Sequence, residues 1–350
     1  MKAVGYIDSL PITNPNALFD TDIDQPVAEG YDLLVKVNAI AVNPVDYKIR
    51  QRVSSTKGKP KVIGWDAVGE VVAVGEKVTH FKTGDTVYYA GDLNRQGSNA
   101  EYQRVDERIV GNQPKSLSNA EAAALPLTTI TAWELLFEHL AIAYQAPGEK
   151  ASKEKAEANE SDDVILVNGA AGGVGSILLQ LIKSLTGAMV IATASREDSI
   201  AWVRKLGADH VIDYREALVP QIEALGLSVT HVASLQSTDK YFDAYVEILA
   251  PFGKIAMIDD LQEPVDVMKL KSKSLSLHLE FMFARSMHHA KDMNKQRHLL
   301  NSVAELIDRG HIKTTLRKHL GTINAENLRK AHEILESGKA IGKIVLEGFG

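Results

Sequence analysis

Two patterns of apolar and polar positions divide this chain into a β-rich part and a part in which strands and helices alternate. Up to about residue 125, short apolar runs are separated by Gly, Pro and Asp, which is typical of β-strands joined by turns. The predicted strands of this part include Leu33–Val37, Gly69–Val74 and Asp85–Tyr89. From about Ser118 the apolar residues take helical spacing, and the β-rich part ends.

The second part begins with a continuous apolar run, Val164–Val167, as expected for a central parallel strand covered on both faces. Strands and helices then alternate, which predicts a doubly wound α/β sheet. The further predicted strands are Met189–Thr193, His210–Ile212, Thr230–Ala233 and Lys254–Ile258, with helices at Ser176–Leu185 and Ser199–Leu206. The preceding segment, 145–163, is dense in Lys, Glu and Ala and predicts a solvated loop or frayed helix.

The composition excludes several classes of function. The 350 residues carry a formal net charge of −6, so no overall positive field attracts nucleic acid. The most membrane-like stretch, Val164–Ile182, contains Asn168 and several glycines, which make it too polar for a confident membrane span. The absence of cysteine excludes disulfides, thiolate zinc sites and a cysteine nucleophile. Because Met1–Leu10 lacks the apolar core of a signal peptide, we expect a cytoplasmic protein.

A glycine-rich segment lies directly between the Val164–Val167 strand and the helix that follows it. In that setting a tight glycine turn lets backbone N–H groups approach a pyrophosphate at the positive end of the helix. Ala170 departs from the literal G-x-G-x-x-G pattern, yet strand, loop and helix occur in the order that the motif requires. We therefore expect a dinucleotide to bind this loop, at Gly169, Ala171, Gly172, Gly173, Val174 and Gly175. Gly175 is expected to let helix and strand pack closely.

The end of the next strand distinguishes NAD from NADP. Proteins that bind NAD carry an Asp or Glu about 20 residues after the glycines, where it binds the ribose hydroxyls. Here Ser195 and Arg196 end the strand, and both side chains are suited to donate to a 2′-phosphate. Glu197 and Asp198 follow, and we expect them in the first turn of the next helix, where acids are favourable. The segment predicts NADPH as the cofactor.

Four longer motifs, Ala41–Asp46, Gly64–Gly69, Leu206–Tyr214 and Gly342–Glu347, are more specific than the glycine loop. Together they resemble the medium-chain dehydrogenase/reductase superfamily, in particular its zinc-free quinone oxidoreductase and enone reductase branch. The resemblance covers nearly the whole chain and implies an α/β protein with a GroES-like, β-rich catalytic domain and a doubly wound Rossmann domain. The expected domains are 1–128 with 285–350, and 129–284 including the charged loop 145–163.

The resemblance also implies individual roles. Tyr214 matches a position that joins Ser195 and Arg196 on the 2′-phosphate, and Thr131 matches a threonine that contacts the nicotinamide amide. Asn43, Tyr47 and Lys48 lie on the segment that lines the cleft facing the nicotinamide, and we expect them to be catalytic. Three of these residues also have an alternative, structural role. Tyr47 could pack in the interior, Lys48 could be a solvated charge, and Thr131 could be a residue at a helix start.

Zinc-containing members of the superfamily carry Cys where this sequence has Asn43 and His where it has Trp65. The Cys-rich lobe that would fall near residues 91–97 is absent, and Asp66 alone does not make a tetrahedral zinc site. We therefore predict no metal and an acceptor that is already activated, a quinone or an α,β-unsaturated carbonyl. Hydrogen-bond donors then stabilise the charge that develops on its oxygen. Asn43 is expected to bind the substrate carbonyl or a ribose hydroxyl, while Tyr47 and Lys48 are protonated donors at neutral pH.

Residues 274–280 alternate polar and apolar positions and predict an exposed edge strand. Relatives pair this strand across a two-fold axis, so the resemblance implies a homodimer. The leading hypothesis is an NADPH-dependent, metal-independent oxidoreductase acting on a small quinone or enone. Two alternatives stay open: an alcohol dehydrogenase of the zinc-containing type, and a weakly catalytic NADPH-binding sensor or structural protein.

Overall fold

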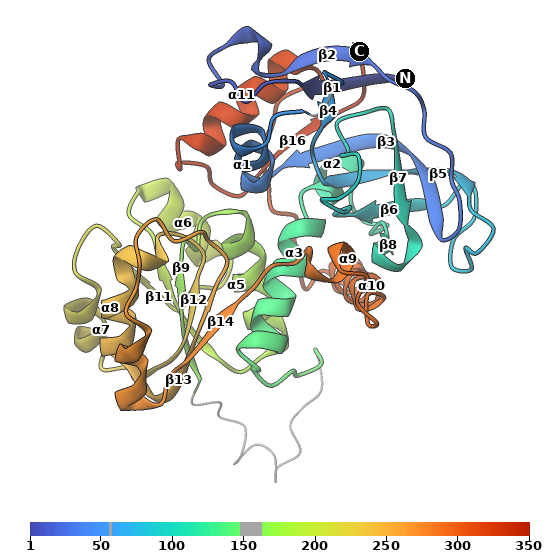
Figure 1. The fold of residues 1–350 in the computed structure, drawn as a ribbon. Coiled ribbons are helices and arrows are strands. Elements are labelled where there is room, and N and C mark those ends of the chain that lie inside the picture. The colour runs from blue at the N-terminus through green and yellow to red at the C-terminus, as the bar shows by residue number, and fades with distance from the viewer. Residues whose placement is uncertain (56–57, 148–162) are drawn as a thin grey trace. The chain divides into compact units, whose positions relative to one another are not determined.

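The computed structural model describes residues 1–55, 58–147 and 163–350 (Figure 1). The predicted charged loop 145–163 therefore lies outside the described residues except at 145–147 and 163. Contacts divide the chain into two compact units: unit 1 is Met1–Ile130 with Met282–Gly350, and unit 2 is Thr131–Phe281. The predicted domains differ from these units only at their boundaries.

Unit 1 contains two sheets. The seven-stranded sheet has the order β15-β16-β3-β5-β6-β8, with β7 paired to β3. Its strands are β3 (Asp32–Val42), β5 (Asp66–Val74), β6 (Thr86–Tyr89), β7 (Tyr102–Asp106), β8 (Val110–Asn112), β15 (Leu316–His319) and β16 (Lys343–Glu347). The three-stranded sheet has the order β2-β1-β4, from β1 (Lys2–Tyr6), β2 (Phe19–Asp22) and β4 (Lys61–Val62). The long strand β3 is buried along nearly its whole length, because it has partners on both sides and is rich in Val, Ile, Leu and Ala.

Helices cover these sheets and place the predicted donors. The helices of unit 1 are α1 (Pro44–Arg52), α2 (Asn119–Ala123), α9 (Ala284–Met287), α10 (Lys295–Asp308) and α11 (Ala325–Glu336), and α3 (Pro126–Trp133) crosses into unit 2. Helix α1 begins directly after β3, where Pro44 occupies the first turn and the Asp46 carboxylate accepts the Asn43 N–H at 2.9 Å. This cap fixes the direction in which α1 leaves the sheet.

Unit 2 is a six-stranded parallel sheet with the order β11-β10-β9-β12-β13-β14. The first strand of the unit lies at the centre of the sheet, which confirms the predicted doubly wound fold. The strands are β9 (Val164–Asn168), β10 (Met189–Thr193), β11 (His210–Ile212), β12 (Val229–Ser234), β13 (Leu249–Met257) and β14 (Ser276–Leu279). The helices are a π-helix (Glu134–His139), α5 (Gly173–Leu185), α6 (Glu197–Lys205), α7 (Leu218–Leu225) and α8 (Thr238–Ile248). Figure 1 shows α7 and α8 together on one side of the sheet.

The structure corrects the bounds of some predicted elements. Helix α5 begins at Gly173 and not at Ser176, because the glycine loop itself forms the first helical turn. The edge strand β14 is Ser276–Leu279 and not 274–280, since Ser274 has a left-handed backbone with φ of 53° and ends the preceding 3₁₀ helix. Glu197 and Asp198 do lie in the first turn of α6, as predicted. Among the described residues, no helix combines the length and apolar character needed to cross a bilayer.

Candidate functional site

The predicted cofactor residues of unit 2, apart from Thr131 on α3, lie at one edge of its sheet. The glycine loop follows β9, Ser195 and Arg196 follow β10, and Tyr214 follows β11. Strand β10 pairs with both β9 and β11, and all three strands are parallel. Their carboxyl ends therefore meet at the same edge, which is where doubly wound sheets bind their ligands.

The glycine loop has the geometry of a tight turn. Gly169 has a left-handed φ of 80°, and its carbonyl accepts the N–H of Gly172 at 3.1 Å. A Cβ added at Gly175 would lie 2.4 Å from the Ala170 carbonyl oxygen. Gly175 is thus required where the first turn of α5 lies against the backbone of Ala170, two residues after the end of β9. Gly172 is the N-cap of α5 and supplies no side-chain cap, so the loop presents backbone groups to a ligand at the helix start.

Side chains that the sequence analysis missed hold this loop in place. The Thr193 hydroxyl donates to Asn168 Oδ1 at 3.0 Å and accepts the Gly169 N–H at 3.1 Å. On the other side of the loop, the Ser176 hydroxyl donates to the Gly172 carbonyl at 2.6 Å and accepts from the Trp202 indole at 2.8 Å. Asn168 ends an otherwise apolar strand directly before the glycines, and that polar residue was the available signal.

The residues predicted to bind the 2′-phosphate differ in their surroundings. The guanidinium of Arg196 lies 3.3 Å from Asp198, and the two side chains are 39% and 60% exposed. An ion pair this exposed contributes little to stability, and the contact of Arg196 with a 2′-phosphate stays a prediction. Tyr214 is partly buried against the core of unit 2, and its carbonyl accepts the Tyr241 hydroxyl at 2.9 Å. Thr131 is buried within α3, and its contact with a nicotinamide stays a prediction.

The predicted donors of unit 1 lie on α1. Tyr47 and Lys48 are both half-buried there, while Asp46 and Arg50 form the buried side of the helix. Arg50 pairs with Glu336 of α11, which anchors α1 against the C-terminal part of unit 1. Helix α1 is therefore fixed at both ends while Tyr47 and Lys48 retain partial exposure.

Asn43 lies in a buried cluster that the sequence did not predict. Its side chain is fully engaged: Nδ2 donates to Asp66 Oδ2 at 2.8 Å and to the Ala41 carbonyl at 3.3 Å, and Oδ1 accepts from Lys343. The Lys343 ammonium also donates to Asp66 Oδ2 at 2.8 Å. These three internal partners fix the orientation of the Asn43 amide, and its contact with a substrate carbonyl or a ribose hydroxyl stays a prediction.

Asp46 adds a second carboxyl group to this region. Burial raises the pKa of Asp46 to about 7, although the N–H of Asn43 and the nearby charge of Lys343 lower it, and the charge of Asp66 adds to the rise. One of its carboxyl oxygens, Oδ1, is buried and has no hydrogen-bond partner among the described residues. A protonated Asp46 removes one negative charge from a region that already contains Asp66.

The residues at the family's zinc positions do not fit a zinc ion. The indole of Trp65 has no lone pair to offer and donates instead to the Asp92 carbonyl at 3.1 Å. Both carboxyl oxygens of Asp66 already accept hydrogen bonds, Oδ1 from the Leu127 N–H at 2.7 Å. In the part of the chain that the structure describes, no group of three or more His, Asp or Glu side chains is arranged to hold a metal.

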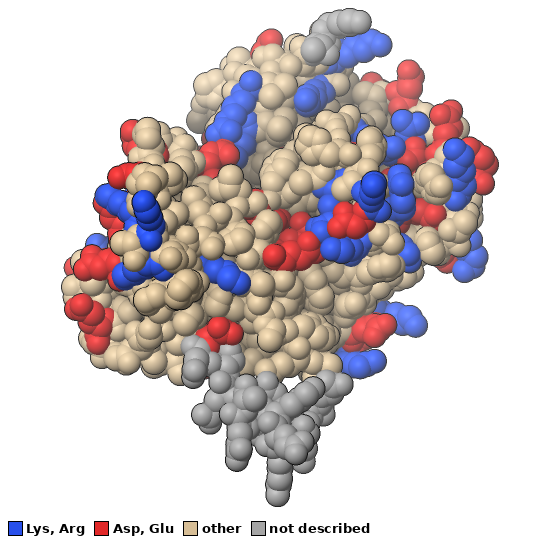
Figure 2. Space-filling model, turned by 60° about the horizontal axis from the view of Figure 1, so that its bottom comes forward, with Lys and Arg blue, Asp and Glu red and all other residues tan. Residues whose placement is uncertain are grey.

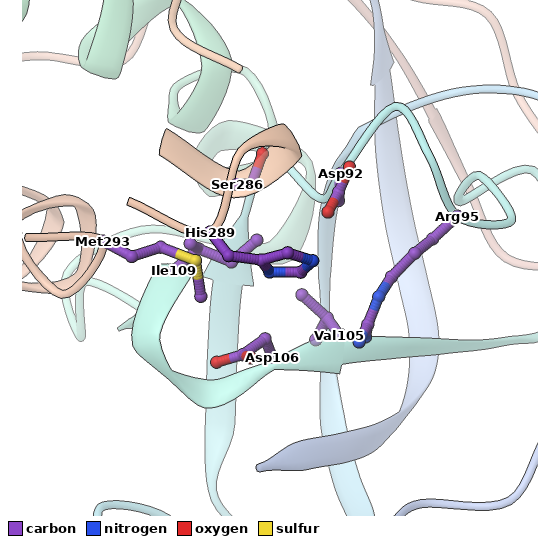
Figure 3. Close-up of a pocket in the computed structure, with 8 residues that line it drawn as sticks. All are labelled: Asp92, Arg95, Val105, Asp106, Ile109, Ser286, His289 and Met293. Atoms are coloured by element: carbon purple, nitrogen blue, oxygen red, sulfur yellow. The ribbon is translucent and has the colours of Figure 1, made fainter. Parts of the chain in front are cut away.

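Two surface features lie apart from these residues. A small recess in unit 1 is bordered by Asp92, Arg95, Asp106 and His289 (Figure 3), and none of the predicted site residues lines it. The guanidinium of Arg95 pairs with Asp32 at 2.7 Å.

Figure 2 shows basic and acidic side chains intermingled on the face in view, without the basic stripe by which proteins bind nucleic acid, as far as the described residues extend.

Two family models match this sequence. Residues 29–115 match the alcohol dehydrogenase GroES-like domain, and residues 206–346 match the zinc-binding dehydrogenase model. A zinc-type alcohol dehydrogenase-like protein from Staphylococcus aureus strain COL is 41% identical over 346 residues, which is 99% of each chain. A 2-methylene-furan-3-one reductase from Solanum lycopersicum is 39% identical over 220 residues, covering 60% of this chain and 50% of that protein.

Solved structures show the same fold over the whole chain. A protein from Rhizobium etli CFN 42, named as a candidate zinc-dependent alcohol dehydrogenase, is 48% identical with a TM-score of 0.92 and covers 100% of this chain and 98% of its own. The Escherichia coli quinone oxidoreductase complexed with NADPH is 25% identical with a TM-score of 0.80, covering 99% and 100%. The predicted combination of a GroES-like domain and a Rossmann domain is confirmed.

Proposed function

Because this chain belongs to the medium-chain dehydrogenase/reductase superfamily of oxidoreductases, we propose that it reduces a quinone or an α,β-unsaturated carbonyl with NADPH and without a metal. The observation that carries the proposal is the edge formed by β9, β10 and β11. There a glycine loop at a helix start lies beside Ser195 and Arg196, which stand where NAD-binding proteins carry an acid. Two relatives support it by name, a quinone oxidoreductase complexed with NADPH and a furanone reductase.

Each part of the chain has a defined task in this proposal. The backbone N–H groups of the glycine loop bind the pyrophosphate, and Ser195, Arg196 and Tyr214 bind the 2′-phosphate. When bound, NADPH supplies a hydride, which the acceptor takes at carbon while negative charge develops on its oxygen. Either Tyr47 or Lys48 donates a hydrogen bond to that oxygen, because consecutive helical residues point in different directions, and that residue or a water protonates the product.

The first test is turnover by protein treated with EDTA, with NADPH or NADH as reductant and one quinone and one small enone as acceptors. NADPH oxidation that depends on an acceptor and survives chelation supports the proposal. Tight NADPH binding with no turnover of any acceptor favours the sensor or structural alternative. Activity that appears only after zinc is added favours the zinc-containing alcohol dehydrogenase alternative.

The preference for NADPH is tested by Arg196→Ala. Loss of a charge-assisted, forked contact with the 2′-phosphate should raise the Kd for NADPH by about 10- to 100-fold. The Kd for NADH should change little, because NADH has no phosphate at this position. Arg204→Ala is the matched control, since Arg204 is exposed in the last turn of the same helix. Equal weakening of both nucleotides by Arg196→Ala would refute the assignment.

We also propose that the chain forms a homodimer through β14. This strand is an edge of the described sheet, and the apolar side chains of Leu279 and Phe281 there are 69% and 50% exposed. Light scattering after size exclusion should give the mass of two chains. Leu279→Lys should shift that mass toward one chain, while Met268→Lys, at a 63% exposed site outside the strand, should leave it unchanged. A wild-type mass of one chain contradicts the proposal.

A further inference from the structure

The buried Lys343 ammonium has all of its donors directed to oxygens inside unit 1. Nζ donates to the Val42 carbonyl at 3.2 Å, to Asn43 Oδ1 and to Asp66 Oδ2 at 2.8 Å. Lys343 is 3% exposed, and Asp66 and Asn43 are 0% and 1% exposed. A lysine is rarely this buried unless it is paired, and here a carboxylate, an amide and a carbonyl surround it.

Of these partners, Asn43 stands at a ligand position of the family's zinc site, and Asp66 lies directly after another. Asn43 occupies the place of a Cys ligand, and Asp66 is the carboxylate retained beside Trp65, which occupies the place of a His ligand. Neither the amide nor the indole replaces the lost ligand, yet the negative charge of Asp66 remains in the interior. A buried carboxylate without a cation carries a large desolvation cost.

We propose that the Lys343 ammonium takes the place of the metal as the fixed cation that neutralises Asp66. The lysine comes from the start of β16, 277 residues from Asp66 in the sequence, so the cation is supplied by the chain itself. Because Nζ already binds the oxygens of both Asn43 and Asp66, a divalent ion has no free ligand there and meets a positive charge. This inference does not depend on the substrate or the cofactor.

The ammonium, at the start of β16, connects four other segments of unit 1. It binds the end of β3 at Val42, the start of α1 at Asn43 and the start of β5 at Asp66. Through Asp66 it reaches the start of α3, where the Leu127 N–H donates to Oδ1. Lys343 is therefore a positioning residue for α1, the helix that carries Tyr47 and Lys48. A bound metal has the same structural effect, since it draws separate segments to one point.

The test compares wild type with Lys343→Met, with Lys343→Met combined with Asp66→Asn, and with Lys318→Met as a control. Lys318 is an exposed lysine on β15, which pairs with β16. Each protein is grown with added zinc, its metal content is measured by plasma mass spectrometry, and its thermal unfolding is followed with EDTA or with zinc chloride. No step in this test requires an active enzyme.

The wild type is expected to hold far less than one zinc per chain and to show the same Tm with EDTA and with zinc. Lys343→Met alone leaves the buried charge of Asp66 without a cation and should lower the Tm by roughly 10 °C or prevent folding. Adding Asp66→Asn removes that charge and should recover at least half of the loss. The amide oxygen introduced at position 66 can still accept the Leu127 N–H. Its NH₂ group can donate to the side-chain oxygen of Asn43 once the Asn43 amide turns over.

Three results overturn the proposal. One is a wild-type protein that holds one zinc per chain and whose Tm falls with EDTA. Another is a Lys343→Met variant as stable as the Lys318→Met control. The third is a double variant no more stable than Lys343→Met, including the case in which both fail to fold, because the loss then does not arise from the stranded carboxylate.

Discussion

Gly175→Ala tests whether the glycine loop is shaped by its own backbone. The added Cβ would lie 2.4 Å from the Ala170 oxygen and 2.6 Å from its carbonyl carbon and Cα, and all three are backbone atoms. Because no side chain can rotate away, the loop must move by about an ångström against the hydrogen bonds that hold Gly169. Overpacking of this kind costs about 1–3 kcal/mol, and we expect the upper half of that range. For a unit of this size the Tm should fall by roughly 4–10 °C.

Gly172→Ala is the matched control in the same loop. Its Cβ would meet only the Gly169 oxygen, at 3.4 Å, and its φ of −71° is open to any residue. Its stability should stay within about 1 kcal/mol of wild type, because two effects oppose each other. Ala is a poorer N-cap than Gly, which destabilises the helix, but it restricts the unfolded chain, which stabilises the folded state. The proposed pyrophosphate contact, in contrast, predicts at least about tenfold weaker NADPH binding, since the methyl group projects toward the ligand.

Thermal unfolding and fluorescence titration with NADPH separate the two effects. Gly175→Ala should lower stability, and Gly172→Ala should lower affinity at nearly wild-type stability. A Gly175→Ala protein with wild-type Tm and wild-type affinity would refute the steric reasoning. Equal destabilisation by both variants would show that the loop tolerates no side chain anywhere and would remove the case for a ligand contact at Gly172.

Three further variants test other parts of the structure. Burial raises the pKa of Asp46 from 3.8 to about 7, so the folded state keeps a proton that the unfolded state releases, and stability falls as pH rises through this window. Asp46→Asn should remove this dependence of stability on pH and should be about 1–3 kcal/mol more stable than wild type at pH 8, as measured by urea titration. A variant no more stable than wild type at pH 8 contradicts the argument that Asp46 keeps a buried proton. Burial and Arg50 lower the pKa of His332 from 6.5 to about 3, so only the unfolded state binds this proton and stability falls as pH drops from 6.5 toward 3. His332→Gln should reduce this loss of stability at acid pH. If the variant loses as much stability as the wild type over the same pH range, other groups cause the loss. Thr193→Val removes the hydroxyl between Asn168 and Gly169 at nearly constant side-chain volume. It should lower the free energy of unfolding by about 1–3 kcal/mol and weaken NADPH binding. Wild-type stability and wild-type affinity would show that the loop does not need this support.

Periodic apolar patterns were sufficient for the fold of unit 2. The strands β9, β10 and β11 have the predicted positions, because a continuous apolar run between turn residues is a local property of a buried parallel strand. The start of α5 was displaced by three residues, since glycines carry no side-chain pattern to mark a helix start. The edge strand was too long for a similar reason: alternation continues through Ser274, but the left-handed backbone of that residue does not belong to a strand.

The placement of the predicted residues Gly169–Gly175, Ser195, Arg196 and Tyr214 was also within reach of the sequence, because loop, strand end and neighbouring strand end follow one another along the chain. Their gathering at one edge needs only the rule that carboxyl ends of parallel strands share an edge. Thr193, by contrast, was expected only as a strand residue. Its hydroxyl acts across two strands, and a cross-strand contact has no signature in a local pattern.

The sequence by itself determined the two-part organisation, the doubly wound sheet and the glycine loop, since each depends on patterns among residues that are close neighbours in the chain. Only the tertiary structure decided which charges meet. Asn43 and Asp66 are 23 residues apart and Lys343 is 277 residues from Asp66, so their cluster forms only when the C-terminal strand returns to β3. A buried ion pair is stabilised by the exclusion of water around it, and that environment exists only after the chain has folded.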